Sequence, residues 1–403
     1  MMRPFASTIS LDEARRHLKE AAQPIARIER VSLEQAAGRV AAAEVTSPID
    51  VPPFARSVMD GYAVIATDTA GATRSTPVSL RLIDRIYTGQ MPTVAVEPGT
   101  CAEIATGAPF PDGADSTVMV EETSAAANGR IHIFAAATPG QHVGRRGADI
   151  QRGSVVAMAG DLLTPSRIGA LAAIGREVVD VFARPRVALL STGNEVVEPG
   201  RTLEPGQIFD VNRFTLAAIV SAHGCVPEPH AAVPDSIEAL IRALDDCAAA
   251  DVLVFSGGSS VGERDLIVDA VRARGRMIFH GVAIRPGKPT AFALVAGKPF
   301  FGMPGNPTSC LSNAYLLLVP FLRTVARQPP YTPRVARVPL AKRIDSSAGR
   351  HQIYTVRITG GVAHPAFKGS GEITSLSRAD GYIEIPPDQS GVQEGALVDV
   401  TLF

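Results

Sequence analysis

The sequence has little of what marks secreted, metal-rich or membrane-spanning proteins. Its 403 residues include only four cysteines, and these lie far apart and form no C-x-x-C pair. Isolated cysteines argue against a disulfide framework and a zinc site, and they predict reduced thiols in an intracellular protein. The N-terminus becomes charged at once, without the apolar core of a signal peptide, and no apolar run approaches the roughly 18 residues of a membrane helix. We therefore expect a cytoplasmic protein with no membrane contact. The cysteines are Cys101, Cys225, Cys247 and Cys310.

An excess of charge of one sign is also missing. Lysine and arginine total 39, aspartate and glutamate total 40, and no basic block occurs. This balance argues against a nucleic-acid binder that relies on a wide positive surface, although it leaves room for a local basic pocket. The length exceeds what a single hydrophobic core supports, so we expect about two to four domains.

Several familiar catalytic motifs are absent as well. The sequence contains no Walker A motif, no G-x-G-x-x-G, no G-x-S-x-G and no H-E-x-x-H, and its histidines form no recognisable metal site or catalytic triad. These absences argue against P-loop, dinucleotide-binding, α/β-hydrolase and zinc-peptidase chemistry.

Capping patterns predict where helices begin. Ser10 stands three residues before Glu13, which is the capping-box spacing, and Ser32 with Gln35 repeats that spacing. Thr164 followed by Pro165 predicts a third helix start. We expect a helix after each of these three positions.

The pattern of apolar and turn-forming residues changes along the chain and predicts an α/β multidomain fold. From about Pro48 to Thr138 the chain carries short β-like runs between Pro- and Gly-rich turns, which indicates a β-rich module. Beyond residue 184, apolar strands alternate with amphipathic helices, which is typical of a parallel α/β sheet covered on both faces. The last seventy or so residues return to short β runs and predict a small all-β barrel or sandwich.

Two loops that follow strands of the α/β part carry polar groups. In such sheets ligands bind beyond the carboxyl ends of the strands. Glycine lets backbone N–H groups approach an anion closely, and a following helix N-terminus favours negative charge. Asp265, at the C-terminal end of the second loop, would suit a metal ion or a proton-bearing ligand group. The alternative is a tight turn without a ligand, in which Asp265 caps the following helix or is solvated. The loop residues of interest are Ser191, Thr192, Gly193 and Glu195 in "STGNE", and Ser256, Gly257, Gly258 and Ser259 in "SGGSSVGERD".

A pair of cations and a proline-rich turn come next. Arg285 and Lys288 lie three apart around a Pro-Gly turn, and an anion between them would offset their repulsion. A solvated basic turn is the alternative. The turn Pro304, Gly305 and Asn306 leads into a further helix and is either an anion-binding start or only a helix entry.

Three polar residues of the first half stand out among apolar neighbours. Asp60 in "SVMDGYAV" and Thr106 in "IATGAP" have no obvious structural need, although ordinary turns explain both. Asp149 follows two arginines in "GRRGADI", where an ion pair is the alternative to a functional role.

Taken together, these stretches resemble the molybdopterin molybdenumtransferase (MoeA) family, to which the E domain of gephyrin also belongs. Eight motifs carry the resemblance, in the family's order and over nearly the whole chain. They are "SVMDGYAV", "IATGAP", "RRGADI", "STGNEV", "FDVNRF", "SGGSSVGERD", "RPGKP" and "MPGNPTSC".

The resemblance implies four domains in an elongated protomer and a homodimer. A discontinuous linking domain would take residues 1–46 and 142–183, and a β-rich domain would be inserted at 47–141. The molybdopterin-binding α/β domain would span 184–328, and a C-terminal β-barrel would span 329–403.

The resemblance also implies a reaction and its residues. Adenylylated molybdopterin and molybdate would give molybdenum cofactor and AMP, assisted by Mg²⁺. Asp235 and Asp265 would hold the metal, while Arg285 and Lys288 would receive molybdate and Ser375 would be a donor from the barrel. Asp60, Thr106, Asp149 and Glu195 match positions in the family's active cleft, which is shared between protomers.

The sequence departs from the family at the anion site. Arg285 stands where lysine is common in the family, and Gly281 stands where some relatives carry a further lysine. Thr355 lies near the position where some relatives have an arginine in the barrel, and Arg350 or Arg357 could substitute for that arginine. Two other functions compete with molybdenum transfer: a gephyrin-like scaffold that binds a partner peptide, and a molybdopterin adenylyltransferase, whose fold resembles the 184–328 portion. A molybdopterin adenylyltransferase and molybdoenzyme-maturation proteins are the expected partners, with no nucleic acid among them.

Overall fold

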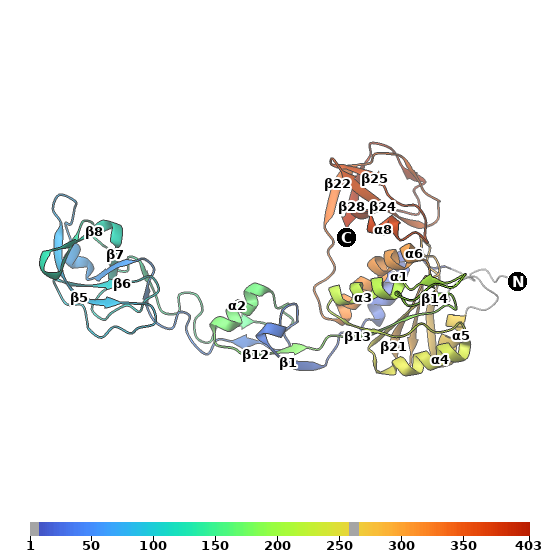
Figure 1. Cartoon of the computed structure of the whole chain (residues 1–403), viewed down its shortest axis with the longest axis horizontal. Coiled ribbons are helices and arrows are strands. Elements are labelled where there is room, and N and C mark those ends of the chain that lie inside the picture. The colour runs from blue at the N-terminus through green and yellow to red at the C-terminus, as the bar shows by residue number, and fades with distance from the viewer. Residues whose placement is uncertain (1–7, 258–265) are drawn as a thin grey trace. The chain divides into compact units, whose positions relative to one another are not determined.

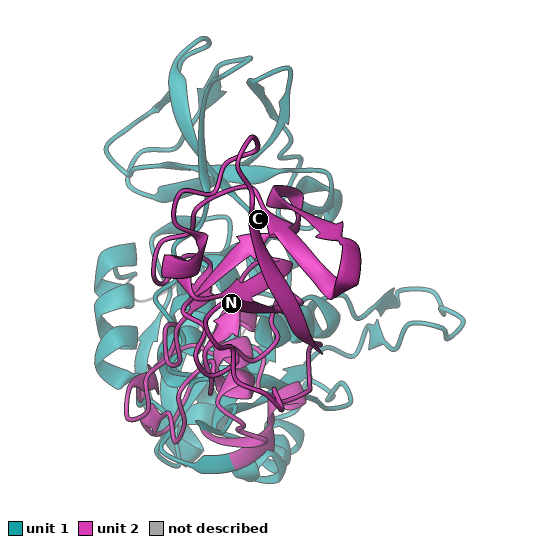
Figure 2. Cartoon of the chain, turned by 90° about the vertical axis from the view of Figure 1, so that its left-hand side faces the viewer, with its two compact units in different colours: residues 1–29, 38–40, 181–403 teal, residues 30–37, 41–180 magenta. Residues whose placement is uncertain are grey.

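The computed structural model describes residues 8–257 and 266–403, and the chain divides into two compact units (Figures 1 and 2). Unit 1 comprises residues 1–29, 38–40 and 181–403, and unit 2 comprises residues 30–37 and 41–180. No helix within the described ranges is both long and apolar enough to cross a bilayer.

Unit 2 is built around a six-stranded sheet with the order β7-β4-β6-β5-β9-β8. Its only parallel neighbours are β5 and β6, and the other pairs are antiparallel. Leu80, Ile104 and Ile133 are fully buried in its core. The β-rich character expected for this part of the chain is confirmed. The strands are β4 (Gly61–Val64), β5 (Val78–Ile86), β6 (Thr100–Ile104), β7 (Ser116–Met119), β8 (Thr123–Ala126) and β9 (Arg130–Ile133).

The rest of unit 2 consists of short elements. Helix α2 (Pro165–Ala173) begins as predicted, with the Thr164 hydroxyl accepting a hydrogen bond from the Arg167 N–H at 3.4 Å. The prediction of a helix after Ser32 is wrong, because only a single 3₁₀ turn forms (Leu33–Gln35). Ser32 makes no side-chain cap, and Gly38 turns the chain with φ of 70°. The remaining elements up to residue 182 are β1 (Ile28–Ser32), β2 (Val45–Thr46), β3 (Arg56–Ser57), β10 (Val143–Gly144), β11 (Val155–Ala157), β12 (Val178–Phe182) and the 3₁₀ turns Ala66–Thr69, Val120–Glu122 and Ala127–Gly129.

Unit 1 contains a second six-stranded sheet, with the order β16-β13-β17-β21-β20-β18. The first four strands are parallel, as expected, but β20 runs antiparallel to both of its neighbours, β21 and β18, so the sheet is mixed. The direction reverses between β20 and β21 because only Ala296 and Gly297 connect them, and such a tight turn reverses the strand direction. The strands are β13 (Arg186–Ser191), β16 (Val226–Pro229), β17 (Val252–Ser256), β18 (Gly275–His280), β20 (Ala291–Val295) and β21 (Lys298–Met303).

Alternating side chains of these strands form two cores, one on each face of the sheet. Val187 and Leu189 pack against α1, α3 and the 307–325 helical segment, whereas Ala188 and Leu190 pack against α4 and α5. The predicted start of α1 is confirmed, since the Ser10 hydroxyl accepts a hydrogen bond from the Glu13 N–H. The helices are α1 (Leu11–Ala21), α3 (Asn212–Ala222), α4 (Ile237–Asp246), α5 (Leu266–Arg274), α6 (Pro307–Asn313), a π-helical turn (Ala314–Leu318), α7 (Val319–Val325) and the 3₁₀ turn Cys247–Ala249.

The C-terminal part of unit 1 is a half-barrel around a sheet with the order β19-β24-β26-β28-β22. Val356 and Val400 lie in its own small core. Strand β19 comes from the α/β part of the chain and pairs in parallel with β24, which ties the two parts together. The elements are β19 (Ile284–Arg285), β22 (Val335–Pro339), β23 (Ile344–Asp345), β24 (His351–Thr359), β25 (Val362–Pro365), α8 (Thr374–Ser377), β26 (Gly381–Ile385), β27 (Gly391–Val392) and β28 (Leu397–Leu402). Strands β14 (Val196–Val197) and β15 (Ile208–Phe209) pair in an excursion before α3.

The four cysteines are buried and free. Burial raises the pKa of Cys101 and Cys225 to about 12 and that of Cys247 to about 11. These thiols are therefore protonated near neutral pH and act as small apolar side chains.

Candidate functional site

The polar loops of unit 1 meet at the carboxyl ends of three neighbouring strands. Ser191 of β13 lies in register with Ser256 of β17, and Ser256 lies in register with Met303 of β21. After β13 the chain forms β16, which pairs with one edge of β13, and it then crosses the sheet to form β17, which pairs with the other edge of β13. The gap between β13 and β17 is therefore the topological switch point, where ligands bind in open α/β sheets.

A buried hydrogen-bond network holds Ser191 in place. Its hydroxyl donates to Asp210 Oδ1 at 2.9 Å and lies 3.2 Å from the hydroxyl of Ser256. Asp210 also accepts from the Arg213 N–H at the start of α3, and its second oxygen lies 3.4 Å from Arg213 Nε. Glu198 pairs with the same guanidinium at 2.6 Å. The Ser191 hydroxyl is thus fixed by hydrogen bonds. Neither Asp210 nor Arg213 was singled out from the sequence.

Two glycines bring the backbone of these loops together. Gly257 has φ of 99°, and a Cβ there would lie 2.3 Å from the Thr192 carbonyl oxygen. Gly193 has φ of 144°, and a Cβ there would meet the Glu195 carboxylate at 2.8 Å. The Thr192 hydroxyl is buried beside Gly257 and has no hydrogen-bond partner in the described parts of the chain. The site therefore holds a buried polar atom that a ligand could satisfy.

Two carboxylates adjoin these loops. The Asp235 N–H donates to Asn194 Oδ1 at 3.2 Å, which joins the loop before α4 to the loop after β13. Partial desolvation, and then the negative charge of Glu195, raise the pKa of Asp235 above its ordinary value. Like charges held this close favour a bound cation between or beside them. The described residues contain no group of three or more metal-ligating side chains, and Asp265, Gly258 and Ser259 lie outside the described residues.

The basic turn lies where the α/β part meets the half-barrel. Arg285 is in β19 and donates from Nη1 to the Ser347 hydroxyl at 2.7 Å. The Lys288 carbonyl accepts from the Val282 N–H, and the Gly287 carbonyl accepts from Asn313 Nδ2 at 2.8 Å. The backbone that carries both cations is therefore anchored from two sides.

The Pro304-Gly305-Asn306 turn is also held by its neighbours. Asn212 at the start of α3 donates from Nδ2 to the Gly305 carbonyl at 2.8 Å. Asn306 donates from its own Nδ2 to the Ser370 hydroxyl at 3.1 Å and forms no side-chain cap on α6. The turn is thus fixed between α3 and a loop of the half-barrel.

Ser375 lies at the base of that same loop. Its buried hydroxyl accepts from the N–H groups of Lys368, at 2.9 Å, and Gly369, at 3.4 Å. It therefore shapes the loop that carries Lys368.

Asp60 and Thr106 are brought together in unit 2. Asp60 Oδ1 accepts a hydrogen bond of 2.7 Å from the Thr106 N–H, and both side chains are exposed. Strand β4 begins at Gly61, directly after Asp60. Only glycine fits at this position, because a Cβ there would lie 2.0 Å from the Val118 carbonyl oxygen. A cavity of about 230 Å³ opens beside Asp60 and is also lined by Arg85 and Glu103, which form an ion pair at 3.0 Å.

Asp149 lies apart from that cavity, on an exposed turn of unit 2. Asp50 accepts a hydrogen bond from the Arg152 N–H at 2.9 Å and pairs with Arg146 at 2.7 Å, and these two contacts lower the pKa of Asp50. An ion pair of Asp149 with one of the two preceding arginines was the alternative to a functional role. Arg146 instead pairs with Asp50.

The departures from the family pattern have distinct environments. Thr355 is buried, with a hydroxyl that has no partner within residues 8–257 and 266–403. Arg350 and Arg357 are exposed. Gly281 has φ of 98° and accepts from the Ile9 N–H, so this position suits glycine by its backbone.

Comparisons with known proteins cover nearly the whole chain. Three family models match in order: the MoeA N-terminal region (domain I and II) at residues 9–175, the "Probable molybdopterin binding domain" at 188–324, and the MoeA C-terminal region (domain IV) at 337–403.

Individual relatives match over most of their length. Molybdopterin molybdenumtransferase 2 of Mycobacterium tuberculosis is 36% identical over 92% of this chain and 94% of its own. Molybdopterin molybdenumtransferase of Haemophilus influenzae is 31% identical over 98% of each chain. The crystal structure of the molybdopterin biosynthesis MoeA protein from Pyrococcus horikoshii superposes with a TM-score of 0.84 and 39% identity, covering 98% of this chain and 99% of that one. The chain belongs to the MoeA family of molybdopterin molybdenumtransferases, enzymes of molybdenum cofactor biosynthesis.

Proposed function

We propose that this enzyme inserts molybdenum from molybdate into adenylylated molybdopterin, forming molybdenum cofactor and releasing AMP. An oxygen of water, or of molybdate with its Mo–O bond then breaking, attacks the phosphorus of the adenylyl group. The P–O bond to the molybdopterin side of the diphosphate breaks, and AMP leaves with the added oxygen. The names of the full-length relatives support the transfer of molybdenum.

The observation that carries the proposal is the alignment of polar groups at the switch point. Ser191 and Ser256 end neighbouring parallel strands, and the buried Thr192 hydroxyl beside them has no partner among the described residues. A phosphate oxygen would satisfy that hydroxyl, and Gly257 leaves the backbone open to a close approach. We therefore assign the pterin-side phosphate to these loops, together with Gly193, Gly258 and Ser259.

Asp235 and Asp265 would hold Mg²⁺, with Glu195 as a further carboxylate beside it. The raised pKa of Asp235 beside Glu195 fits such a site, because a cation would offset their repulsion. When bound, the metal would offset the negative charge of the diphosphate as AMP leaves. Asn194 positions Asp235 through its backbone N–H.

Molybdate would lie between Arg285 and Lys288. Arg285 is already oriented by the Ser347 hydroxyl of the half-barrel, and Ser375 shapes the loop whose other end binds Asn306. A tetrahedral dianion suits two cations on an anchored turn. Because molybdate would wait next to the bond that breaks, proximity would supply much of the rate enhancement.

We further propose that the cleft is shared between two protomers of a homodimer in the cytoplasm. Asp60 and Thr106 belong to unit 2, whereas Asp235 and the strand-end loops belong to unit 1. Unit 2 of one protomer would supply Asp60, Thr106 and Asp149 to unit 1 of its partner, as the resemblance to the family implies.

The test is incubation of the purified protein with adenylylated molybdopterin, molybdate and Mg²⁺, with AMP and active cofactor measured together. We expect the two products in equal amounts. Consumption of ATP with molybdopterin would instead identify an adenylyltransferase. Binding without either product would support a scaffold and overturn the proposal.

A further inference from the structure

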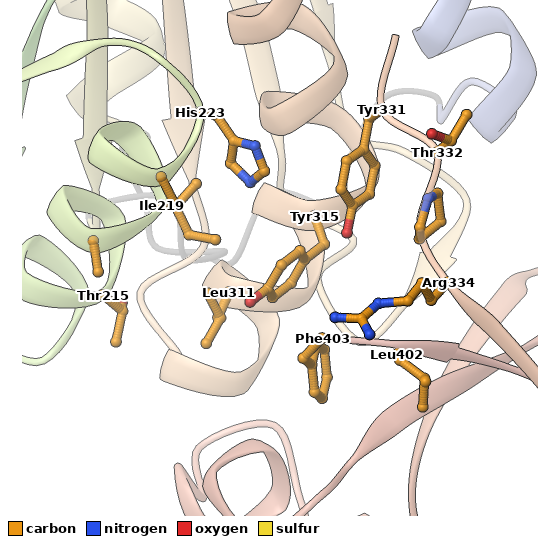
Figure 3. Close-up of a pocket in the computed structure, with 13 residues that line it drawn as sticks. Thr215, Ile219, His223, Leu311, Tyr315, Tyr331, Thr332, Arg334, Leu402 and Phe403 are labelled. Atoms are coloured by element: carbon orange, nitrogen blue, oxygen red, sulfur yellow. The ribbon is translucent and has the colours of Figure 1, made fainter. Parts of the chain in front are cut away.

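A pocket of unit 1 lies away from the strand-end loops, between helix α3, the helical segment that contains Leu311 and Tyr315, and the connection into the half-barrel (Figure 3). Its volume is about 530 Å³, within the range of about 300–1,000 Å³ that is usual for small-molecule sites. None of the residues assigned to the proposed reaction lines it.

Aromatic rings form much of the wall. Tyr315 and Phe403 pack with ring centroids 5.1 Å apart, and Tyr331 meets His223 edge to face at 5.5 Å. Figure 3 shows the ring edges of Tyr315, Tyr331 and Phe403 around one space. Such walls favour a flat aromatic ligand, because offset or edge-to-face packing of rings adds binding free energy beyond that from the buried area.

The polar side chains that line the pocket can donate hydrogen bonds, and no carboxylate side chain is among them. No aspartate or glutamate is among the residues that line it, and Arg334 extends its guanidinium toward the space between Tyr331 and Phe403 (Figure 3). No ion pair joins Arg334 to a carboxylate in the described parts of the chain. An anion in the pocket would therefore meet an arginine that pairs with no carboxylate side chain of residues 8–257 and 266–403.

The remaining donors face the same space. The hydroxyls of Tyr315 and Tyr331 make no hydrogen bond to another described residue, although both rings are half-buried. His223 lies 3.4 Å from the Arg323 guanidinium through Nδ1. Burial, and then the charge of Arg323, lower the pKa of His223, so its ring is neutral near pH 7.

We propose that this pocket binds a planar aromatic anion, a flat ring system of one or two fused rings that carries a carboxylate, sulfonate or phosphate group. The ring would lie against Tyr315, Tyr331 and Phe403, and the anionic group would bind Arg334 with a tyrosine hydroxyl beside it. The site is separate from the proposed reaction centre and goes beyond the transfer of molybdenum.

The probe is naphthalene-2-sulfonate, whose own fluorescence reports binding and which contains no pterin, adenine or phosphate. Titration of the full-length protein is expected to give saturable binding of one probe per chain. Methanesulfonate, which lacks the ring, and naphthalene-2-methanol, which lacks the charge, are each expected to compete at least about tenfold more weakly, because each makes only part of the contacts.

Variants locate the bound probe. Arg334→Gln is expected to weaken binding about tenfold or more, since a charged hydrogen bond is lost. Arg337→Gln is the matched control, because Arg337 lies three residues further on, is exposed and faces Asp399 instead. Tyr331→Phe keeps the ring and tests the hydroxyl alone, and Asp235→Asn alters the proposed reaction centre without touching the pocket.

Three results would overturn the proposal: no saturable binding, equal binding of the uncharged alcohol, or wild-type affinity in a folded Arg334→Gln variant. Loss of binding in Asp235→Asn but not in Arg334→Gln would place the probe at the reaction centre instead. The proposed function has its own readout, AMP and cofactor formation without the probe, so the two ideas can fail independently.

Discussion

The strand-end loops of unit 1 and the Asp60–Thr106 pair of unit 2 are assigned to one reaction, yet they are built differently. Ser191 and Asp210 are buried in a network that reaches Arg213 and Glu198. The Asp60 side chain is exposed and, within the described residues, accepts one hydrogen bond, from the Thr106 N–H. A side chain fixed by burial contributes to folding as well as to chemistry, whereas an exposed one can be removed at little cost to the fold. The contrast predicts which substitutions change stability, activity or both.

The buried ion pair gives the largest expected effect on stability. Asp210→Ala removes the acceptor for Ser191 and leaves Arg213 with less compensation, so the free energy of unfolding is expected to fall by about 3–5 kcal/mol. Asp245→Ala is the matched control, because its pair with Arg274 at 3.0 Å is exposed and is expected to contribute far less. Urea unfolding measures both, and equal losses would show that burial does not distinguish the two pairs.

The close approach at Gly257 gives the next largest effect. In Gly257→Ala the new Cβ would lie 2.3 Å from the Thr192 carbonyl, so the loop must shift. A displacement of about 1 Å in a reaction centre lowers the rate about 100-fold, and we expect a loss of that order in cofactor formation.

Gly297→Ala separates this effect from backbone strain. Gly297 has φ of 79°, also in the left-handed region, but a Cβ there meets no atom within 4 Å. Both variants are expected to lose stability, of the order of 1 kcal/mol from strain, while only Gly257→Ala loses activity. Normal activity in Gly257→Ala would mean that this approach has no part in the site.

The smallest effect concerns Glu195 and Asp235. A raised carboxyl pKa means that the ionised form is disfavoured in the folded state, so the penalty is present above that pKa and disappears as the pH falls through it. Glu195→Gln removes part of the penalty. In metal-free buffer we expect a gain in unfolding free energy of less than about 1 kcal/mol at neutral pH, which shrinks on acidification. Glu204→Gln, at another exposed glutamate, controls for the loss of charge, and a gain that grows in acid would contradict the assignment.

Local chemistry made parts of the fold predictable. Ser10 and Thr164 start helices as expected, because a side-chain cap acts within three residues. Ser32 has the same spacing but starts only a 3₁₀ turn, since the chain is diverted at Gly38 before a helix can propagate. The antiparallel direction of β20 also escaped prediction, because an apolar strand pattern does not itself show the direction in which the strand runs.

The candidate site shows the same division. Ser191, Ser256 and Gly257 could be selected because polar and glycine residues directly follow apolar strands, and their alignment follows from the sheet. Asp210 and Asn212 were missed as individual residues, although "FDVNRF" contains both. Their partners, Ser191 and Gly305, are remote in sequence, so only the fold reveals the contacts.

The most direct test of the shared cleft uses mixed dimers of Asp60→Ala and Asp235→Ala. Each variant alone is expected to be nearly inactive, because every cleft of its homodimer lacks one carboxylate. In a mixed dimer, one of the two clefts would have both acids. Full exchange makes half of the dimers mixed, so cofactor formation should recover to about a quarter of the wild-type rate by two-site counting. If subunit exchange is verified and no activity returns, Asp60 and Asp235 do not act across protomers and the account of a shared cleft is wrong.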